Sequence, residues 1–477
     1  MNSLNCDVAI IGAGACGLSL AFCLHKLAPS LDIAVLDSEQ EVGKKLARTG
    51  NGRCNLANNC WKREFYHSLS WQNEADYVDF WRKFLDDEKL DVLSTVKGFW
   101  QNVGVFLLDQ ADWLYPRFLS AKQLRDKLYA SCQTENVHFY LSCKVKSISK
   151  QKNTYGLEAV LNEAKLFVNT RYLVWAAGGL SQCNQAATSL AYTALENLHV
   201  PMRASLPALV QLQTKPNYLR LTGLRLKVEA KLLLTDGEFI SQRGEVLFAK
   251  YGLSGIVSMI LATYYQQDLA KQVYIPNECK QKLSQAEQKT LQKHLKRLEF
   301  LWPKFKPAQA NYLLLNLLDE LTDADILDFI RCNSACQAKF KTDKSTDLAK
   351  VHLTKALLDF LLSALLPSKL MAIIEEQLEQ YWPALTQASL ANLLYYLRNW
   401  PLIIQSTLSL KEAQVSLGGV DLKAINPRDF SLQVLENCYV GGEMLDLVGD
   451  CGGYNLMLAI WSAIRISESI LTKEKHK

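Results

Sequence analysis

Residues 7–37, "DVAIIGAGACGLSLAFCLHKLAPSLDIAVLD", contain the pattern that decides the fold. A short apolar segment, Val8 to Ile11, is followed by three closely spaced glycines and then by a helix-like run that continues to about Leu27. A second apolar segment, Ile33 to Leu36, ends at Asp37. This order of strand, GxGxxG turn, helix, strand and acidic residue is typical of a βαβ unit that binds a dinucleotide.

The three glycines and the acid each have a physical role in such a unit. Gly12 allows the tight turn, Gly14 lets a pyrophosphate approach the backbone, and Gly17 lets the helix pack closely on the strand. The helix N-terminus then offers amide donors and a partial positive charge to the phosphates. Asp37 is predicted to accept both hydroxyls of the adenosine ribose. The pattern alone fits NAD or FAD, and its place near the first residue of the sequence favours FAD.

The composition is that of a soluble protein with several domains. Hydrophobic residues make up 49% of the 477 residues and charged residues 21%, and a chain of this length is expected to form about three domains. The net charge of +5 is small and no basic stripe with interleaved aromatic residues stands out, so we expect no nucleic-acid partner. No apolar run resembles a membrane span, so we expect no membrane partner either.

Thirteen cysteines are scattered along the chain, and none of them forms a CxxC pair. This distribution predicts reduced thiols in a cytoplasmic protein rather than a disulfide framework, and it predicts no structural metal site. Cys54 and Cys451 lie in motifs expected near the cofactor. We interpret them as small packing residues, with a redox pair as the alternative.

Four later stretches of the sequence extend the pattern to the far end of the chain. They are "GKKLARTGNGRCNLAN" (43–58), "LVWAAGGLS" (173–181), "AQVSLGGVDLKAINP" (413–427) and "CYVGGEMLDLVGDCGGYNLMLAIWSA" (438–463). Together with the first βαβ unit they resemble the BaiN/RdsA-type NAD(P)/FAD-dependent oxidoreductases, the flavoproteins similar to YhiN and to aminoacetone oxidase. The motifs occur in the same order as in that family, and they lie at both ends of the chain. The resemblance therefore covers most of its length.

The resemblance implies an α/β fold in which a Rossmann-type FAD-binding domain carries an inserted β-rich domain and a small helical domain. The FAD-binding domain is expected over 1–205 and 418–477, the β-rich substrate domain over 206–275 with a return strand in 399–417, and the helical domain over 276–398.

Local patterns point the same way. Residues 137–177 contain short strand-like runs with a turn near Asn153, and Asp236-Gly237 is typical of a hairpin turn. From about Lys280 to Arg398 the apolar residues recur at helical spacing, which predicts helices throughout that region.

The resemblance also assigns the residues that hold FAD. Lys45 and Arg53 are expected on the adenosine-pyrophosphate side, and Asn55 near the flavin. Glu443 is expected to bond ribityl hydroxyls, while the helix that begins near Gly453 faces the flavin pyrimidine edge and stabilises negative charge there. The full expected set is Gly12, Ala13, Gly14, Cys16, Gly17, Asp37, Ser38, Lys45, Arg53, Asn55, Val145, Gly178, Gly442, Glu443, Asn455 and Leu456.

The chain departs from the family pattern after the "AAGG" of residues 176–179. The family's usual glycine-rich stretch is replaced by "LSQCNQAATSLAY" (180–192). Side chains such as Asn184 and Ala187 need room that glycine would leave free, so the pocket wall is expected to differ here.

These observations predict an FAD-dependent oxidoreductase that acts on a small organic substrate by hydride transfer at flavin N5. NAD(P)H or O2 is expected as its electron partner, and the sequence marks no catalytic residue. The departure after Gly179 motivates a first alternative, an FAD-binding sensor or partner-binding protein with little turnover. A second alternative is flavin-dependent RNA modification, against which the modest charge argues.

Overall fold

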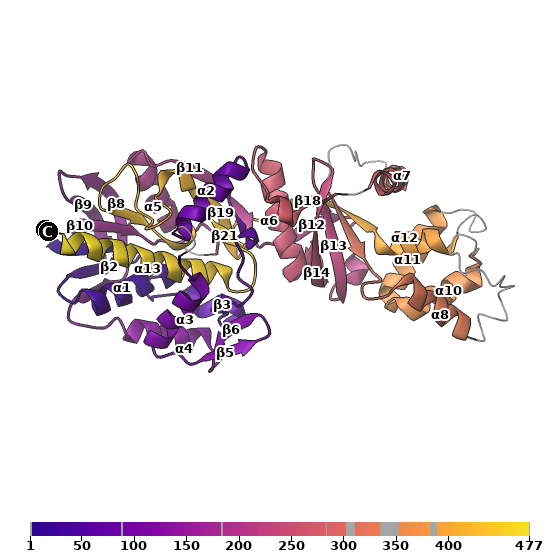
Figure 1. The fold of residues 1–477 in the computed structure, drawn as a ribbon, viewed down its shortest axis with the longest axis horizontal. Helices are drawn as coiled ribbons and strands as arrows, with labels where there is room; N and C mark the ends of the chain where they lie inside the picture. Colours follow the sequence, from indigo (N-terminus) through magenta and orange to yellow (C-terminus); the bar gives the residue numbers. More distant parts are fainter. Residues whose placement is uncertain are drawn as a thin grey trace. The chain divides into compact units, whose positions relative to one another are not determined.

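The computed structural model describes residues 2–86, 89–182, 185–282, 284–301, 311–333, 353–381 and 389–476. The chain forms two compact units. The first contains Met1–Val210, Gln266–Pro276 and Ser409–Lys477, and the second contains Gln211–Tyr265 and Asn277–Leu408 (Figure 1). The first unit thus joins the two ends of the sequence, and the second unit is inserted between them.

A mixed sheet forms the centre of the first unit. Its parallel part has the order β7-β2-β1-β10, with β20 parallel to the end of β10, and an antiparallel part continues through β9 and β8. The strands are β1 (Asn2–Ile11), β2 (Ile33–Leu36), β7 (Val137–Tyr140), β8 (Cys143–Lys150), β9 (Tyr155–Leu161), β10 (Ala164–Trp175) and β20 (Cys438–Val440). This strand order is that of a Rossmann-type nucleotide-binding sheet. The strands expected over 137–177, with their turn between β8 and β9, are confirmed.

Helix α1 (Ala15–Leu27) links β1 to β2, and helix α13 (Tyr454–Lys475) runs beside it (Figure 1). Val8, Ala9 and Ile10 of β1 are fully buried, as expected for a parallel strand with both faces covered. The helix expected near Gly453 is confirmed, because Gly453 is the N-cap residue of α13. Thus α13, near the C-terminal end of the sequence, packs beside α1 on the sheet that contains β1, near the N-terminal end.

Smaller elements surround this sheet in the first unit. They are the helices α2 (Glu74–Phe84), α3 (Val92–Asn102), α4 (Ala121–Ala130) and α5 (Gln185–Asn197), the three-stranded sheet of β3 (Ala57–Asn58), β6 (Trp113–Pro116) and β5 (Leu107–Gln110), and the strand pairs β4 (Tyr66–His67) with β21 (Val448–Gly449) and β11 (Met202–Ala208) with β19 (Val415–Val420). The pairs β4–β21 and β11–β19 tie segments of the N-terminal half to the C-terminal motif.

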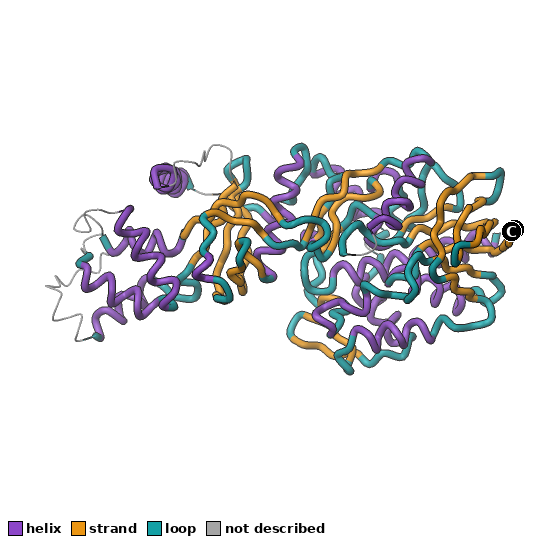
Figure 2. Tube along the Cα trace, turned by 180° about the vertical axis from the view of Figure 1, so that it is seen from behind, coloured by secondary structure: helices purple, strands orange, loops and turns teal. Residues whose placement is uncertain are grey.

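The second unit is built on six antiparallel strands whose sheet closes on itself, drawn in orange in Figure 2. The closed order is β13 (Arg225–Leu233), β17 (Asn311–Asn316), β18 (Trp400–Thr407), β12 (Leu212–Lys215), β15 (Gly252–Ser254) and β14 (Glu238–Ala249), which pairs again with β13. The short β16 (Gln281–Lys282) adds to β14. Asp236 and Gly237 lie in the turn between β13 and β14, so the predicted hairpin is confirmed.

Helices complete the second unit, and one prediction for this region was wrong. The helices are α6 (Ile256–Ala270), whose last residues belong to the first unit, α7 (Gln285–Leu301), α8 (Asp323–Cys332), α10 (Lys355–Leu365), α11 (Ser368–Tyr381) and α12 (Leu390–Arg398). However, Asn311–Asn316 forms the strand β17 inside the region 280–398 that was predicted to be helical throughout. A run of six residues is too short to show a period, and pairing with β13 and β18 determines its conformation. Parts of this region, 302–310, 334–352 and 382–388, lie outside the described residues.

The predicted α/β fold, with a Rossmann-type domain, a β-rich insertion and helices, is confirmed. The finer domain boundaries, including a separate helical domain over 276–398, stay a prediction. Within the described part of the chain, no helix combines the length and apolar character needed to cross a membrane.

Replacing Gly17 by alanine should destabilise the first unit strongly. A Cβ on Gly17 would lie 1.9 Å from the backbone oxygen of Gly12, and neither backbone segment can move without opening the contact between β1 and α1. We expect a loss of about 3 kcal/mol in the free energy of unfolding, measured by urea denaturation. The control is Gly98→Ala in the interior of α3, where a Cβ meets nothing within 4 Å and alanine should stabilise by about 0.5–1 kcal/mol. Equal effects of the two substitutions would contradict the close packing at Gly17.

Candidate functional site

The glycine turn and Asp37 form one structure at the carboxyl end of β1. The amide of Ala13 donates to Oδ2 of Asp37 at 2.6 Å, and the amide of Glu39 donates to Oδ1 at 2.8 Å. Burial raises the pKa of Asp37, and these two amide donors oppose that shift. Gly12 has a φ of 110°, and a Cβ placed on Gly14, the N-cap residue of α1, would meet no atom within 4 Å. The turn therefore orients a carboxylate and leaves open space beside the N-terminus of α1.

A cavity of about 60 Å³ lies next to this turn. It brings together four of the predicted residues, Gly12, Asp37, Ser38 and Val145. The other lining residues are Ile11, Leu36, Cys143, Lys144, Ala177, Ala187, Thr188, Leu190, Ala191 and Ala194. In open α/β sheets, nucleotides bind at the carboxyl ends of the strands where the strand order reverses, and this cavity lies at such a point.

Five of these lining residues belong to α5, and four of them fall in the stretch 180–192, where the pocket wall was expected to differ from the family pattern. Ala187, named above as a departure from the family pattern, is among them. Asn184, the other residue named there, lies outside the described residues. The fold adds that a helix, α5, forms this part of the wall.

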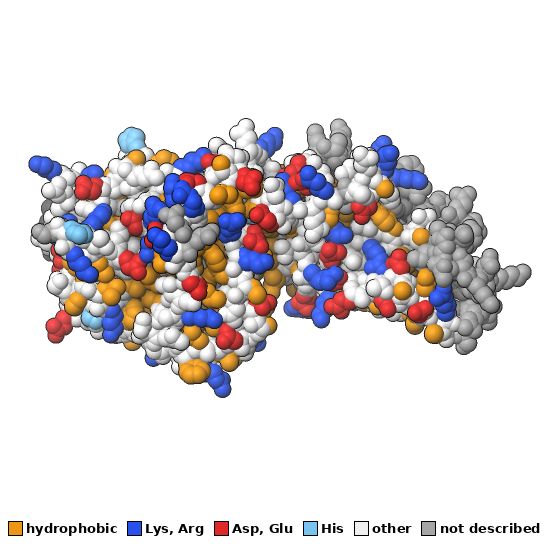
Figure 3. Space-filling model, in the orientation of Figure 1, with side chains coloured by type: hydrophobic (Ala, Val, Ile, Leu, Met, Phe, Trp, Pro, Cys, Tyr) orange, Lys and Arg blue, Asp and Glu red, His pale blue; other side chains and the backbone are white. Residues whose placement is uncertain are grey.

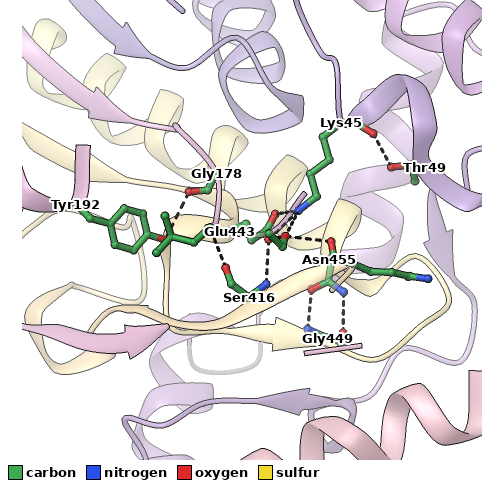
Figure 4. Close-up of polar contacts among 11 residues, drawn as sticks. Lys45, Thr49, Gly178, Tyr192, Ser416, Glu443, Gly449 and Asn455 are labelled. Carbon is green, nitrogen blue, oxygen red and sulfur yellow. Dashed lines mark hydrogen bonds and ion pairs between the residues drawn. The ribbon is translucent and has the colours of Figure 1, made fainter. Parts of the chain in front are cut away.

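A partly buried ion pair and its hydrogen bonds join four segments of the chain (Figure 4). Nζ of Lys45 lies 2.6 Å from Oε2 and 2.8 Å from Oε1 of Glu443, and it donates to Oγ of Ser181 at 2.7 Å. Oε1 of Glu443 also accepts from the Oγ of Ser181 at 3.0 Å and from the amide of Ser416 at 3.1 Å. The carboxylate is thus held by one cation, one hydroxyl and one amide.

This pairing was not anticipated from the sequence, which assigned Lys45 to the pyrophosphate side and Glu443 to the ribityl chain separately. Gly179 explains how close the segments come, because a Cβ there would lie 2.1 Å from Oγ of Ser416 and 2.5 Å from Oε1 of Glu443. Ser181 and Ser416, which bind this ion pair, were not singled out from the sequence, although both lie within the quoted stretches 173–181 and 413–427.

Cys16 and Gly442 meet below the end of β20. The amide of Gly442, whose φ is 65°, donates to Oγ of Ser462 at 2.9 Å, and Sγ of Cys16 lies 3.5 Å from the same oxygen. A Cβ on Gly441 would lie 2.6 Å from Sγ of Cys16. Burial raises the pKa of the Cys16 thiol to about 11. Cys16 therefore packs as a neutral side chain under the glycine pair that precedes Glu443.

The N-terminus of α13 forms the other end of the site. Asn455 binds Gly449 with both polar atoms of its side chain, accepting from the amide at 2.8 Å and donating to the carbonyl at 2.7 Å (Figure 4). A Cβ on Gly453 would lie 2.7 Å from Oδ1 of Asn55, so that only glycine fits beside it. Leu456, also predicted here, is buried in the first turns of α13.

Asn55 carries an unused acceptor at this point. Its side chain is only 8% exposed, and its Oδ1 has no hydrogen-bond partner among the described residues. A buried polar atom without a partner costs free energy and calls for an explanation. An N–H or O–H donor of a ligand at the N-terminus of α13 would satisfy it.

The two remaining predicted residues differ in their surroundings. Gly178 has a φ of 79°, a Cβ placed there would meet nothing within 4 Å, and its carbonyl accepts from the hydroxyl of Tyr192 at 3.5 Å (Figure 4). Arg53 is exposed. Burial raises the pKa of Tyr115, and the positive charge of Arg53 opposes that shift. Gly178 thus offers open backbone near the ion pair, whereas Arg53 lies at the surface.

A buried polar network, also missed from the sequence, supports the C-terminal motif. Asp446 accepts from Oγ of Ser68 at 2.9 Å, from Oγ of Ser70 at 2.6 Å and from the amide of Gly418 at 2.9 Å. Burial raises the pKa of Asp446 to about 6. The two aspartates within "LDLVGD" (445–450) were the signal that could have pointed to such a network.

His67 joins the same region to α6. One ring nitrogen lies 2.7 Å from Oδ1 of Asp450 and the other lies 2.9 Å from Oε1 of Gln267. His67 and Asp450 are both buried. They hold the segment that leads into α13.

The alternative of a redox pair finds no support in the thiols themselves. Cys54 and Cys451 are both free, and burial raises the pKa of each, that of Cys451 to about 12. A thiol whose pKa is raised is a poor nucleophile at neutral pH, which favours packing over a redox role for the buried Cys54 and the partly buried Cys451.

The model of one protein family, described as the HI0933-like protein Rossmann domain, matches residues 6–469 of this chain. The chain belongs to the HI0933-like family. This membership agrees with the resemblance drawn from the five sequence motifs. The chain is therefore an oxidoreductase with a Rossmann-type FAD-binding fold.

Three relatives of this HI0933-like chain have assigned activities. The 3-dehydro-bile acid delta(4,6)-reductase of Clostridium scindens is 24% identical over 95% of this chain and 96% of its own. Ribosomal RNA dihydrouridine synthases are 23% identical in Haemophilus influenzae, over 97% of both chains, and 26% identical in Escherichia coli, over 96% of both. The last two names speak against the expectation that this chain has no nucleic-acid partner.

Replacing Asp446 by asparagine should change how stability depends on pH. The pKa of Asp446 is about 6 in the folded protein and near 3.9 in an unfolded chain, so the folded state binds the proton more tightly. This contribution to stability is complete below about pH 4 and is lost as the pH rises through 6.

The Asp446→Asn variant cannot titrate at this position, so its free energy of unfolding should not fall for this reason as the pH rises. The difference in free energy of unfolding between the wild type and the variant should change by about 3 kcal/mol between pH 4 and pH 7, measured by urea denaturation. A difference that stays constant over this range would contradict the raised pKa.

Proposed function

We propose that this chain binds FAD in an extended form, from the cavity at Asp37 to the N-terminus of α13, and transfers hydride between the flavin and a small organic substrate. The observation that carries the proposal is the unpartnered, buried Oδ1 of Asn55 beside Gly453, at the opposite end of the site from Asp37. This oxygen can accept a hydrogen bond, and none of the described residues donates one to it, so a donor of the bound flavin would satisfy it.

The residues present fit FAD along this whole line. Asp37 would bind the adenosine ribose, and the open space at Gly14 with the N-terminus of α1 would take the pyrophosphate. Gly178 and Glu443 would lie along the ribityl chain, and Asn55 with the first amides of α13 would bind the flavin ring. When bound, FAD supplies hydride transfer at its N5 atom.

The chain's own groups prepare the site for that transfer. The N-terminus of α13, a helix of 22 residues, favours negative charge beside it. Lys45 places a cation next to Glu443, so that the carboxylate is not left as an unbalanced negative charge beside the cofactor. The buried network of Asp446 and Ser70 keeps β19 and the C-terminal motif in register.

The names of the relatives support a substrate class. The delta(4,6)-reductase acts on a 3-dehydro bile acid and the dihydrouridine synthase forms dihydrouridine from uridine. In both cases a ring C=C bond conjugated with a carbonyl group is reduced. We therefore propose that the substrate of this chain contains a C=C bond conjugated with a carbonyl. The net reaction adds a hydride and a proton across that bond, or removes them in the reverse direction.

A second candidate function is flavin-dependent modification of RNA. It is favoured by the two relatives named as ribosomal RNA dihydrouridine synthases, whose chains are covered almost completely. On the face in Figure 3, acidic and basic side chains are interspersed and form no continuous basic field. Retention of a ribosomal RNA fragment at low salt, lost on adding salt, would support RNA as substrate; no retention at low salt would exclude it.

The proposed function is tested by the absorbance and the cofactor of the purified protein. We expect oxidised-flavin absorbance, release of a molecule with the mass of FAD, anaerobic bleaching by NADH or NADPH, and recovery with O2 or a conjugated enone. A protein that binds no FAD would overturn the proposal. If only dithionite bleaches the flavin, the chain is an FAD-binding protein without turnover.

Replacing Lys45 by methionine should weaken FAD binding. The substitution leaves the partly buried carboxylate of Glu443 without its cation, close to the negatively charged cofactor. We expect the Kd for FAD to rise by roughly 10-fold or more, measured by flavin absorbance in equilibrium dialysis. The control is Lys44→Met, because Lys44 is exposed and pairs with Glu39 at the surface, where ion pairs contribute little. Equal FAD affinity in the two variants would show that the ion pair has no part in cofactor binding.

A further inference from the structure

Trp113 is a large aromatic side chain that stays 39% exposed at the edge of the proposed flavin site. It begins β6 and lies opposite Asn58 of β3 in the small three-stranded sheet. Its Nε1 is 3.4 Å from the position that a Cβ on Gly452 would take, and Nδ2 of Asn58 is 3.1 Å from that position. Trp113 therefore borders the glycine pair that opens α13.

The hairpin that carries Trp113 is firmly anchored. The amide of Asn59 donates to the carbonyl of Asp112 at 2.7 Å, and Nδ2 of Asn59 donates to Oδ1 of Asp109 at 2.7 Å. The thiol of Cys60 donates to Oδ1 of Asp112 at 3.2 Å. Because the tip is held on both strands, the exposed indole is presented in a defined place and loses little entropy on binding a ligand.

The surroundings of the ring restrict what it can bind. The rings of Trp113 and Tyr115 form a T-shaped pair, with the centroids 6.4 Å apart and the planes at 75°, so another aromatic side chain supports the indole from within the protein. Asp109 and Asp112 place exposed carboxylates at the tip of the same hairpin. These carboxylates disfavour a polyanion at the tip itself, while the cation of Arg53, which opposes the burial-driven rise in the pKa of Tyr115, offsets part of their charge; an uncharged flat ring can bind the indole without depending on either sign.

We propose that Trp113 is a specificity-determining residue that stacks on the conjugated, uncharged ring of a small-molecule substrate at the mouth of the flavin site. The proposal rests on the proposed function, since it needs the flavin ring at the N-terminus of α13. Aromatic stacking on a flat ring is tolerant of substituents, so this contact selects a class of ring systems.

The test uses the FAD-loaded protein and three variants: Trp113→Ala, Trp113→Phe and, as the control, Phe106→Ala. Phe106 lies just before β5 of the same hairpin and is 76% exposed. Each protein is reduced anaerobically with dithionite, and reoxidation of the flavin is followed at 450 nm with 4-androstene-3,17-dione, uridine or a uridine-containing RNA hairpin. The dione and uridine are the small conjugated rings, and the RNA presents the same base on a polyanion.

We expect Trp113→Ala to lower kcat/KM for at least one small ring by about 10- to 100-fold, mainly through KM. Trp113→Phe should stay within about 3-fold of the wild type and Phe106→Ala should equal it, with the flavin spectrum unchanged throughout.

Several results would overturn the proposal: an equal effect of Trp113→Ala and Phe106→Ala, an altered flavin spectrum or FAD affinity in Trp113→Ala, or reoxidation by the RNA hairpin alone. A wild-type protein that holds FAD but reduces none of the probes would overturn it as well. Failure of the proposed function is recognised separately, because a protein without FAD lacks absorbance at 450 nm before any probe is added.

Discussion

The parallel pairing of β1 with β10 is the constraint on which the first unit depends. Residues 2–11 pair with residues 166–175, far away in the sequence, and the two strands end side by side. Gly12 and Ala176 therefore come so close that a Cβ on Gly12 would lie 2.3 Å from the carbonyl oxygen of Ala176. β20 then pairs with the end of β10 and brings Gly442 and Glu443 to the same edge. Three motifs from distant parts of the chain meet because of this one ladder.

The ion pair between Lys45 and Glu443 shows how that edge is stabilised. A carboxylate in this partly buried position loses hydration, and it recovers the loss through one cation, one hydroxyl and one amide. The same contacts connect the loop after β2, the loop after β10, strand β19 and the segment after β20. A cofactor bound along this edge would meet a wall whose charges are already balanced, so binding requires little rearrangement of the protein.

The region in front of α13 depends on buried polar contacts of a different kind. Asp446 ties Ser68 and Ser70 to β19, while His67 bridges Asp450 and Gln267. These groups hold a backbone in which Gly452 and Gly453 both have positive φ, as the turn into α13 requires. Trp113 lies beside Gly452 with an exposed ring, and Asn55 lies beside Gly453 with an unpaired acceptor.

The sequence by itself determined the elements whose signals are local. The βαβ unit, the hairpin turn at Asp236-Gly237 and the start of α13 follow from spacing, glycines and apolar periodicity, because turn geometry and helix packing act between neighbours in the chain. The membership of the HI0933-like family also followed from short motifs read in order.

Only the tertiary structure decided the rest. It made a strand of Asn311–Asn316 and paired Lys45 with Glu443. Each of these results depends on a partner far away in the sequence, and no local pattern specifies such a partner.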